Sequence, residues 1–325
     1  MDFGSIFNNT AAYLFSPVTI AYALAATGLA VHFGYAGLLN FGMAAFMAIG
    51  GYGYAISVLS FGLPWWIGML VGLGGGALFA LLLGIPTLRL RADYLAIATI
   101  AAGEIVRLLF TTELFHKWTN SAGGLAGYHG GFRSANPIPP GTYGFGPWIF
   151  NENDLWNRIF GIAMLALSLL LVWALMRSPW GRVLKGIRED EDAVRSLGKN
   201  VFSYKMQALV IGGVIGAMGG IVFVLPSAVV PNSYSTSLTF FLWTILLLGG
   251  AATVFGPTLG AVLFWLVFAL LGNILPDLAK AGYLPMSDTQ AGTIRFVLVG
   301  LALMLLVIFR PQGLLGDKRE MTFVQ

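Results

Sequence analysis

The sequence predicts an all-α protein that crosses a membrane many times and forms a single transmembrane domain over residues 1–325. Its composition supports this, because 57% of the residues are hydrophobic and only 10% are charged. A soluble domain of this size does not carry so much apolar surface. The apolar residues are also gathered into long segments, as membrane-spanning helices require. The chain has no cysteine, which excludes disulfides and thiolate metal sites, and its three isolated histidines have no metal-ligand spacing.

Nine apolar segments are long enough, or nearly so, to cross a hydrocarbon core that needs about 20 helical residues. They cover residues 17–34, 38–60, 64–84, 94–112, 156–176, 206–225, 238–253, 256–275 and 291–309. The boundaries between the first and second segments and between the seventh and eighth are weakly defined. The sequence therefore predicts about nine transmembrane helices, with eight to ten allowed.

The basic residues predict the orientation of the chain. In the nine-span arrangement twelve of the eighteen Lys and Arg residues lie on one side: Arg89, Arg91, seven residues between 177 and 205, Arg310, Lys318 and Arg319. Cytoplasmic loops are enriched in Lys and Arg, so this side is expected to be cytoplasmic. The C-terminus is then inside and the N-terminus outside, and the first span is expected to act as the membrane signal in place of a cleaved one.

Residues 178–206 form the only long polar segment between two strongly apolar ones, and we call this segment the elbow. Its apolar residues fall at helical spacing in two groups: Val183, Leu184 and Ile187, and then Ala193, Val194 and Leu197. The acidic run 189–192 lies where a second helix would begin, and Gly198 lies where it would stop. A loop that only sets topology needs basic residues but no apolar faces. The pattern therefore predicts two short amphipathic helices with a cytoplasmic function.

Glycines crowd the stretch from Gly34 to Gly53 in the first and second predicted spans. Glycine allows close helix contact, and it also allows a helix to break at membrane depth where the freed backbone faces protein or a water-filled path. Small residues at helix contacts are common in any bundle, so packing is the favoured interpretation. A direct role in a pathway stays open.

Two ionisable residues, Glu104 and Arg107, lie three apart in the fourth predicted span and can pair on one helix face. Ionisable groups within a span often belong to a polar path. These two lie near the outer end of the span, where a paired or snorkelling charge costs little, so a structural pair is favoured. The candidate residues for a translocation pathway are Asn40, Tyr94, Thr99 and Glu104.

The longest segment without a span is residues 113–155, which is rich in Gly, Pro, Asn and aromatic residues. Aromatic residues are typical of any membrane interface. A loop of this length is nevertheless uncommon unless it has a task, so we expect an external loop with a function.

Several stretches resemble one family of membrane transport proteins. The elbow sequence GRVLKGIREDEDAVRSLGKNVFSYK is similar to the M-type permease subunit of branched-chain amino acid importers, which belong to the ATP-binding-cassette (ABC) class. The spacing from Asp192 and Ala193 to Gly198 resembles the Glu-Ala-Ala-x-x-x-Gly coupling signature of ABC-importer permeases. GYAGLLNFGMAAFMAIGGY, TNSAGGLAGYHG, GGAATVFGPTLGA and FRPQGLLGDKRE are similar to other parts of the family, with Asn40 at a place where serine is frequent.

The resemblance implies a type II ABC-importer permease in the bacterial cytoplasmic membrane that works by alternating access. The elbow would dock into a groove of the ATP-hydrolysing partner through Arg182, Lys185, Ile187, Arg188, Asp192, Ala193, Val194, Leu197 and Gly198. The implied partners are a second homologous permease, two ATP-binding subunits and an external substrate-binding protein. Branched-chain amino acids are the implied substrates, with urea and short amides as the alternative.

Other classes of function have less support in the residues. The chain has no G-x-x-x-x-G-K-[ST] loop, so ATP with Mg²⁺ would bind to partner subunits and this chain would hold no cofactor. An intramembrane enzyme would need a nucleophile with its base, or a metal cluster, and neither pattern is present, so a non-catalytic subunit is expected. An ion-coupled secondary transporter would rely on intramembrane ionisable groups such as Glu104 and Arg107. No feature points to nucleic acid.

Overall fold

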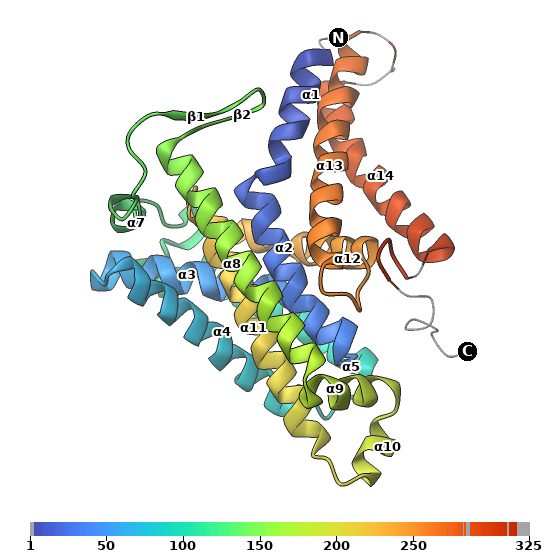
Figure 1. The fold of residues 1–325 in the computed structure, drawn as a ribbon. Coiled ribbons are helices and arrows are strands. Elements are labelled where there is room, and N and C mark those ends of the chain that lie inside the picture. The colour runs from blue at the N-terminus through green and yellow to red at the C-terminus, as the bar shows by residue number, and fades with distance from the viewer. Residues whose placement is uncertain (1–2, 282, 284–286, 311, 317–325) are drawn as a thin grey trace.

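The computed structural model describes residues 3–281, 283, 287–310 and 312–316. The main helices are α1 (Phe3–Ala12), α2 (Pro17–Leu29), α3 (Met43–Phe61), α4 (Trp65–Thr87), α5 (Ala92–Thr111), α8 (Glu152–Arg177), α9 (Pro179–Glu189), α10 (Glu191–Ser196), α11 (Val201–Val224), α12 (Thr236–Gly249), α13 (Gly256–Lys280) and α14 (Asp288–Phe309). The short elements are α6 (His116–Thr119), α7 (Gly130–Ser134), the antiparallel pair β1 (Thr142–Phe145) and β2 (Trp148–Asn151), and the π-helical turn η2 (Ala30–Tyr35). Figure 1 shows the elbow helices α9 and α10 at one end of the molecule and the β1–β2 hairpin toward the other.

The predicted all-α membrane fold is confirmed. Each of the nine predicted segments contains one helix, and in the described residues seven helices are long and apolar enough to cross a membrane. The helix α12 has 14 residues and falls short of that length, whereas α14 has 22 residues. The helix α1 at the N-terminus was not predicted as a span, and its 10 residues are too few to be one.

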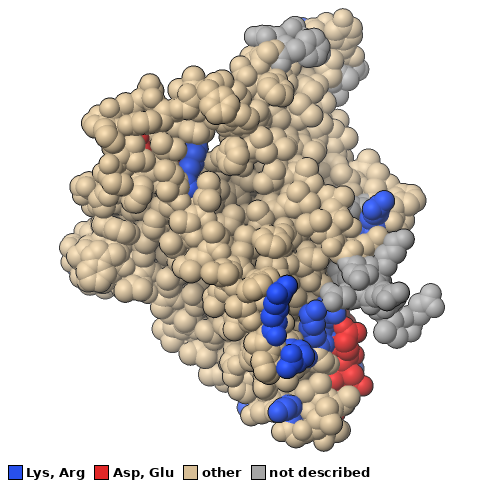
Figure 2. All heavy atoms as spheres, in the orientation of Figure 1, with Lys and Arg blue, Asp and Glu red and all other residues tan. Residues whose placement is uncertain are grey.

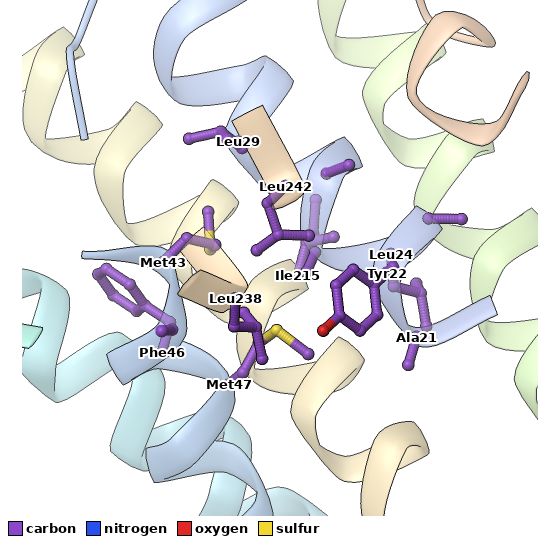
Figure 3. Close-up of a cluster of buried hydrophobic side chains, with 14 of the residues drawn as sticks. Ala21, Tyr22, Leu24, Leu29, Met43, Phe46, Met47, Ile215, Leu238 and Leu242 are labelled. Carbon is purple, nitrogen blue, oxygen red and sulfur yellow. The ribbon is translucent and has the colours of Figure 1, made fainter. Parts of the chain in front are cut away.

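The core lies where α2, α3, α11 and α12 meet (Figure 3). Side chains from all four helices interdigitate there, including Leu24, Phe46, Met47, Ile215 and Leu242, and each of these is almost fully buried. Glycines bring the backbones together, because a Cβ at Gly50 on α3 would overlap the carbonyl of Ala217 on α11, and one at Gly220 on α11 would overlap the carbonyl of Met47 on α3. The favoured packing role of the glycines is therefore seen at these helix contacts.

The first span ends in a break. The α-helix α2 continues as the π-helical turn η2, and residues 36–42 are not helical before α3 starts at Met43. The prediction placed the second span from residue 38, about five residues too early. Side chains from other helices bind the backbone of residues 40–44, and such partners let a non-helical segment persist at membrane depth.

The segment predicted as an external loop is folded against the bundle. Leu125 and Val229 form a backbone bridge, and the Tyr128 hydroxyl donates hydrogen bonds to the carbonyls of Val224 (3.1 Å) and Ser227 (2.6 Å). Burial raises the pKa of the Tyr128 hydroxyl well above its usual range, so it remains a donor. The following helix α8 starts at Glu152, with Asn151 as its N-cap, so the predicted boundary at 155 lies inside that helix.

The turn after α14 packs against the C-terminal end of α12. The amides of Leu314 and Leu315 donate to the carbonyls of Leu248 and Gly249, both at 3.0 Å. Of the basic residues used to predict orientation, Lys318 and Arg319 lie outside the described residues.

Candidate coupling and pathway sites

The elbow begins with a sharp corner between α8 and α9. Pro179 occupies the first turn of α9, where its missing N–H costs nothing. A Cβ at Gly181 would lie 2.6 Å from the carbonyl oxygen of Met176, so a larger residue cannot occupy this corner without moving one helix. The corner thereby fixes the direction in which the elbow leaves the bundle.

The second elbow helix, α10, begins and ends where the sequence predicts. The Asp190 carboxylate caps α10 by accepting from the amides of Asp192 (3.0 Å) and Ala193 (2.9 Å). Gly198 has φ +75° just after the helix, a left-handed conformation that favours glycine. The polar residues after it do not extend the loop to 206, because Asn200 caps α11 and the helix starts at Val201.

A small hydrophobic core holds the two elbow helices together. It consists of Ile187 on α9, Val194 on α10 and Val201 on α11, all buried. Ile187 and Val194 were predicted to dock onto a partner, but here they face each other inside the elbow. Helical spacing shows that residues share a face but does not show what covers that face.

Most of the remaining predicted docking residues lie on the surface, but Lys185 is half-buried and Arg188 is turned inward. Leu197 is 78% exposed, and Ala193, Gly198 and Arg182 are exposed as well. Lys and Arg side chains gather over α9 and α10 with Asp and Glu beside them (Figure 2). Arg195 pairs with Glu191 (3.0 Å) and Asp192 (2.8 Å), and Lys205 of α11 also pairs with Glu191. We call Ala193, Leu197 and Gly198 the elbow patch, an apolar surface rimmed by charge.

Arg188 points into the bundle, whereas Arg182 and Arg195 of the elbow are exposed. Its side chain is 14% exposed, and its Nη1 donates to the Gly34 carbonyl at 2.6 Å. Glu189 accepts from its Nε at 2.9 Å and its Nη2 at 2.6 Å. This guanidinium therefore contacts the end of the first span, although the sequence placed it on the docking surface.

Two of the four candidate pathway residues come together at the break in the first span. Asn40 and Thr99 are both buried, and the Thr99 hydroxyl accepts from the amide of Phe41 at 2.9 Å. Tyr94 is separate from them, since its side chain is 62% exposed at the start of α5.

Glu104 is also separate from the break and pairs with Arg107. The bonds from the guanidinium to the Glu104 carboxylate span 2.5 to 3.1 Å, and Arg107 Nη1 donates to Asn232 Oδ1 at 3.3 Å. The predicted contact between the two charges is therefore present. The bond from Arg107 to Asn232 connects α5 to the 3₁₀ turn at Pro231–Tyr234.

Sequence reasoning missed the other members of the buried cluster around the break. His32 contacts Asn40 and the carbonyl of Leu209, the Trp243 indole N–H donates to the Asn40 carbonyl at 3.3 Å, and the Thr239 hydroxyl accepts from the amide of Ala44. A lone histidine in an apolar span was a signal that could have been used, because buried polar groups need partners. The identity of those partners could not be read locally.

A comparison with known families decides the classification. The model of the family described as "Branched-chain amino acid transport system / permease component" matches residues 13–308. The chain belongs to this permease family. The match includes the elbow, the break and every span except the last residue of α14.

Individual relatives agree with the family match. The high-affinity branched-chain amino acid permease protein LivM of Salmonella typhimurium is 31% identical over 93% of this permease and 69% of the relative. The probable LivM of Methanocaldococcus jannaschii is 28% identical over 93% and 92% of the two chains. The nucleoside ABC transporter permease protein NupC of Lactococcus lactis is 25% identical over 85% and 86%. The relatives that this chain resembles are thus named for different substrates.

Proposed function

We propose that this permease is the membrane subunit of an ATP-driven importer of branched-chain amino acids. The elbow patch is the observation that carries the proposal. Its three residues are exposed on a two-helix segment that is braced from behind by its own small core and by ion pairs. An exposed apolar centre with a charged rim is the composition expected of a protein interface. We assign this interface to an ATP-binding subunit.

Transport then proceeds by alternating access in an assembly of two permeases, two ATP-binding subunits and an external substrate-binding protein. The present chain is non-catalytic, and ATP with Mg²⁺ is bound and hydrolysed on the partner subunits. Closure of those subunits moves the elbow, and the bundle responds by exposing its pathway to the other side. The folded segment 113–151 offers the substrate-binding protein a surface away from the elbow, with the β1–β2 hairpin toward the opposite end of the molecule (Figure 1).

The proposed location is the bacterial cytoplasmic membrane, with the elbow and the C-terminus in the cytoplasm and the N-terminus outside. The concentration of Lys and Arg at the elbow end supports this orientation (Figure 2). The negative charge of the cytoplasmic leaflet favours the same placement.

The proposed substrates are leucine, isoleucine and valine. Family membership and the two LivM relatives support this choice, while the similarity to the Lactococcus nucleoside permease makes nucleosides the second candidate. Urea and short amides form a third class. These substrate classes differ in size and charge, so uptake measurements can separate them.

The test is uptake by proteoliposomes that contain this permease, its second permease and the ATP-binding subunits, with the substrate-binding protein added outside. We expect ATP enclosed in the vesicles to drive accumulation of labelled leucine, while labelled uridine and urea are not taken up. Vesicles loaded with a non-hydrolysable ATP analogue are the control. Uptake driven by a proton gradient without ATP would overturn the proposal in favour of a secondary transporter, and uridine accumulation would overturn the substrate.

A further inference from the structure

We propose that Arg188 transmits movement of the elbow to the break in the first span. This inference rests on the proposed function and assigns a specific positioning role to one residue. The proposal concerns the contact between α9 and the segment 30–42, which we call the hub. The contact between Arg188 and the hub lies inside the permease and is separate from the elbow patch.

The contact between Arg188 and the hub is close on two sides. Arg188 Nη1 donates to the Gly34 carbonyl at 2.6 Å, a bond strengthened by the charge of the guanidinium. The stem of the side chain lies against Gly37, which has φ +70°, and a Cβ there would come within 3.2 Å of Arg188 Cγ. Glu189 holds the guanidinium from the solvent side. The side chain therefore has little freedom to absorb a displacement of α9.

The Gly34 carbonyl is available to Arg188 because the helix ends there. The turn η2 stops at Tyr35, and the amides of Gly37 and Leu38 beyond it donate to the carbonyls of Phe33 and His32 and not to that of Gly34. A cation at this end also complements the helix dipole. On its other side Gly34 packs directly on the backbone of Ala251, in the turn between α12 and α13. A displacement of the Gly34 carbonyl would therefore also displace the tightly packed backbone of Ala251.

The hub connects three helices that are far apart in the sequence. His32 bonds to the Leu209 carbonyl of α11 at 3.0 Å, Phe41 bonds to Thr99 of α5 at 2.9 Å, and the Asn40 carbonyl accepts from Trp243 of α12. Non-helical backbone at membrane depth is either buried in protein or lines a cavity, and in many transporters broken helices form the substrate site. A movement delivered at Gly34 thus reaches the segment that holds Asn40 and Thr99 in place.

Arg91 serves as the control residue for the test. It is exposed directly before α5 and outside the elbow, whereas Arg188 is turned into the bundle. The variants are Arg188→Met, which keeps the apolar stem, Arg188→Lys, which keeps the charge, and Arg91→Met as the control. All are made in the full assembly of permeases, ATP-binding subunits and substrate-binding protein. The readouts are co-purification of the ATP-binding subunits, basal ATP hydrolysis, its stimulation by substrate-loaded binding protein, and transport.

We expect Arg188→Met to keep assembly and basal hydrolysis while stimulated hydrolysis and transport fall about tenfold, the effect of losing one charge-assisted hydrogen bond. Arg188→Lys should restore part of the loss, and Arg91→Met should resemble the unaltered protein. Loss of the ATP-binding subunits from Arg188→Met would overturn the proposal, because Arg188 would then be a docking residue. Normal stimulation in Arg188→Met would overturn it as well.

A second measurement follows the hub directly. The chain contains no cysteine, so Leu39→Cys in the partly buried break gives a single reporter on this subunit. We expect its reaction rate with a thiol reagent to change on adding ATP, and we expect Arg188→Met to abolish that change. An ATP-dependent change that persists in Arg188→Met would overturn the relay. An unaltered assembly that shows neither stimulation nor transport would instead overturn the proposed function.

Discussion

The side-chain amide of Asn40 donates to Nδ1 of His32 across 3.0 Å, and this contact determines the state of both residues. Because His32 Nε2 faces the Leu209 carbonyl, it must carry the ring proton, so Nδ1 is the acceptor. The Asn40 Oδ1 atom in turn accepts from the Gly42 amide at 2.7 Å. The neutral imidazole and one amide orientation satisfy all of these groups together.

Asn40→Leu should therefore destabilise the permease strongly. It leaves His32 Nδ1 and the Gly42 amide buried without these partners, and each such group costs about 1–3 kcal/mol. We expect a lower thermal midpoint in detergent, measured by intrinsic fluorescence. Asn9→Leu, at an exposed asparagine of α1, is the control, and Asn40→Ser should be intermediate because serine is too short to reach both groups. An unchanged midpoint for Asn40→Leu would contradict the network.

Leu197 and Val194 should respond differently to the same substitution, although they are three residues apart. Leu197→Asp changes an exposed residue of the elbow patch and should weaken binding of the ATP-binding subunit by about 2 kcal/mol or more, as for a central interface residue. Val194→Asp places a carboxylate in the elbow core and should unfold the elbow.

Co-purification and limited proteolysis separate these two effects. Leu197→Asp and Ala193→Arg should lose the partner with an intact elbow, whereas Val194→Asp should lose the partner and become sensitive to protease within residues 178–200. Retained assembly with normal stimulated ATP hydrolysis in both Leu197→Asp and Ala193→Arg would mean that the elbow patch is not the interface.

Glu104 and Arg107 should behave as one structural unit. Glu104→Gln leaves a cation and Arg107→Gln leaves an anion within a span, while the double variant leaves neither. We expect the double variant to transport better than either single one. In the free energy of unfolding, the double-mutant cycle should give an interaction energy of roughly 1 kcal/mol, because the pair is partly exposed. Single variants that fold normally while transport loses its dependence on a proton gradient would favour a secondary transporter.

Two glycines give opposite expectations for the same change to alanine. Gly220→Ala should prevent normal packing of α11 on α3, because the added methyl overlaps the Met47 carbonyl. Gly74→Ala adds a methyl with no described neighbour within 4 Å and should stabilise α4 by about 0.5–1 kcal/mol. Yield of monodisperse protein and thermal midpoint measure both effects, and equal behaviour of the two variants would contradict the packing.

The proposed orientation predicts which positions an impermeant thiol reagent reaches in intact cells. Cysteine introduced at the exposed Ser134 should react from outside, and cysteine at the exposed Lys199 should react only after the cytoplasmic face is opened. The chain has no other cysteine to interfere. The reverse result at these two positions would show that the orientation is inverted.

Features that depend on near neighbours in the chain could be predicted from the sequence. The apolar segments correspond to the helices because a span of hydrophobic residues must form its backbone hydrogen bonds within itself. The Asp190 cap and the stop at Gly198 involve residues within a few positions of each other, so the two elbow helices were also predictable. The pairing of Glu104 with Arg107 follows from the same local geometry.

Tertiary structure decided which face each of these residues presents. Val194 and Leu197 share the apolar signal of α10, but only packing against Ile187 and Val201 shows that Val194 is covered. The partners of the hub lie far away in sequence, since His32 meets Leu209 and Asn40 meets Trp243 only when α11 and α12 pack against the first span. Buried polar groups must find some partner, but the partner is fixed by which helices lie side by side, and that is a property of the assembled bundle.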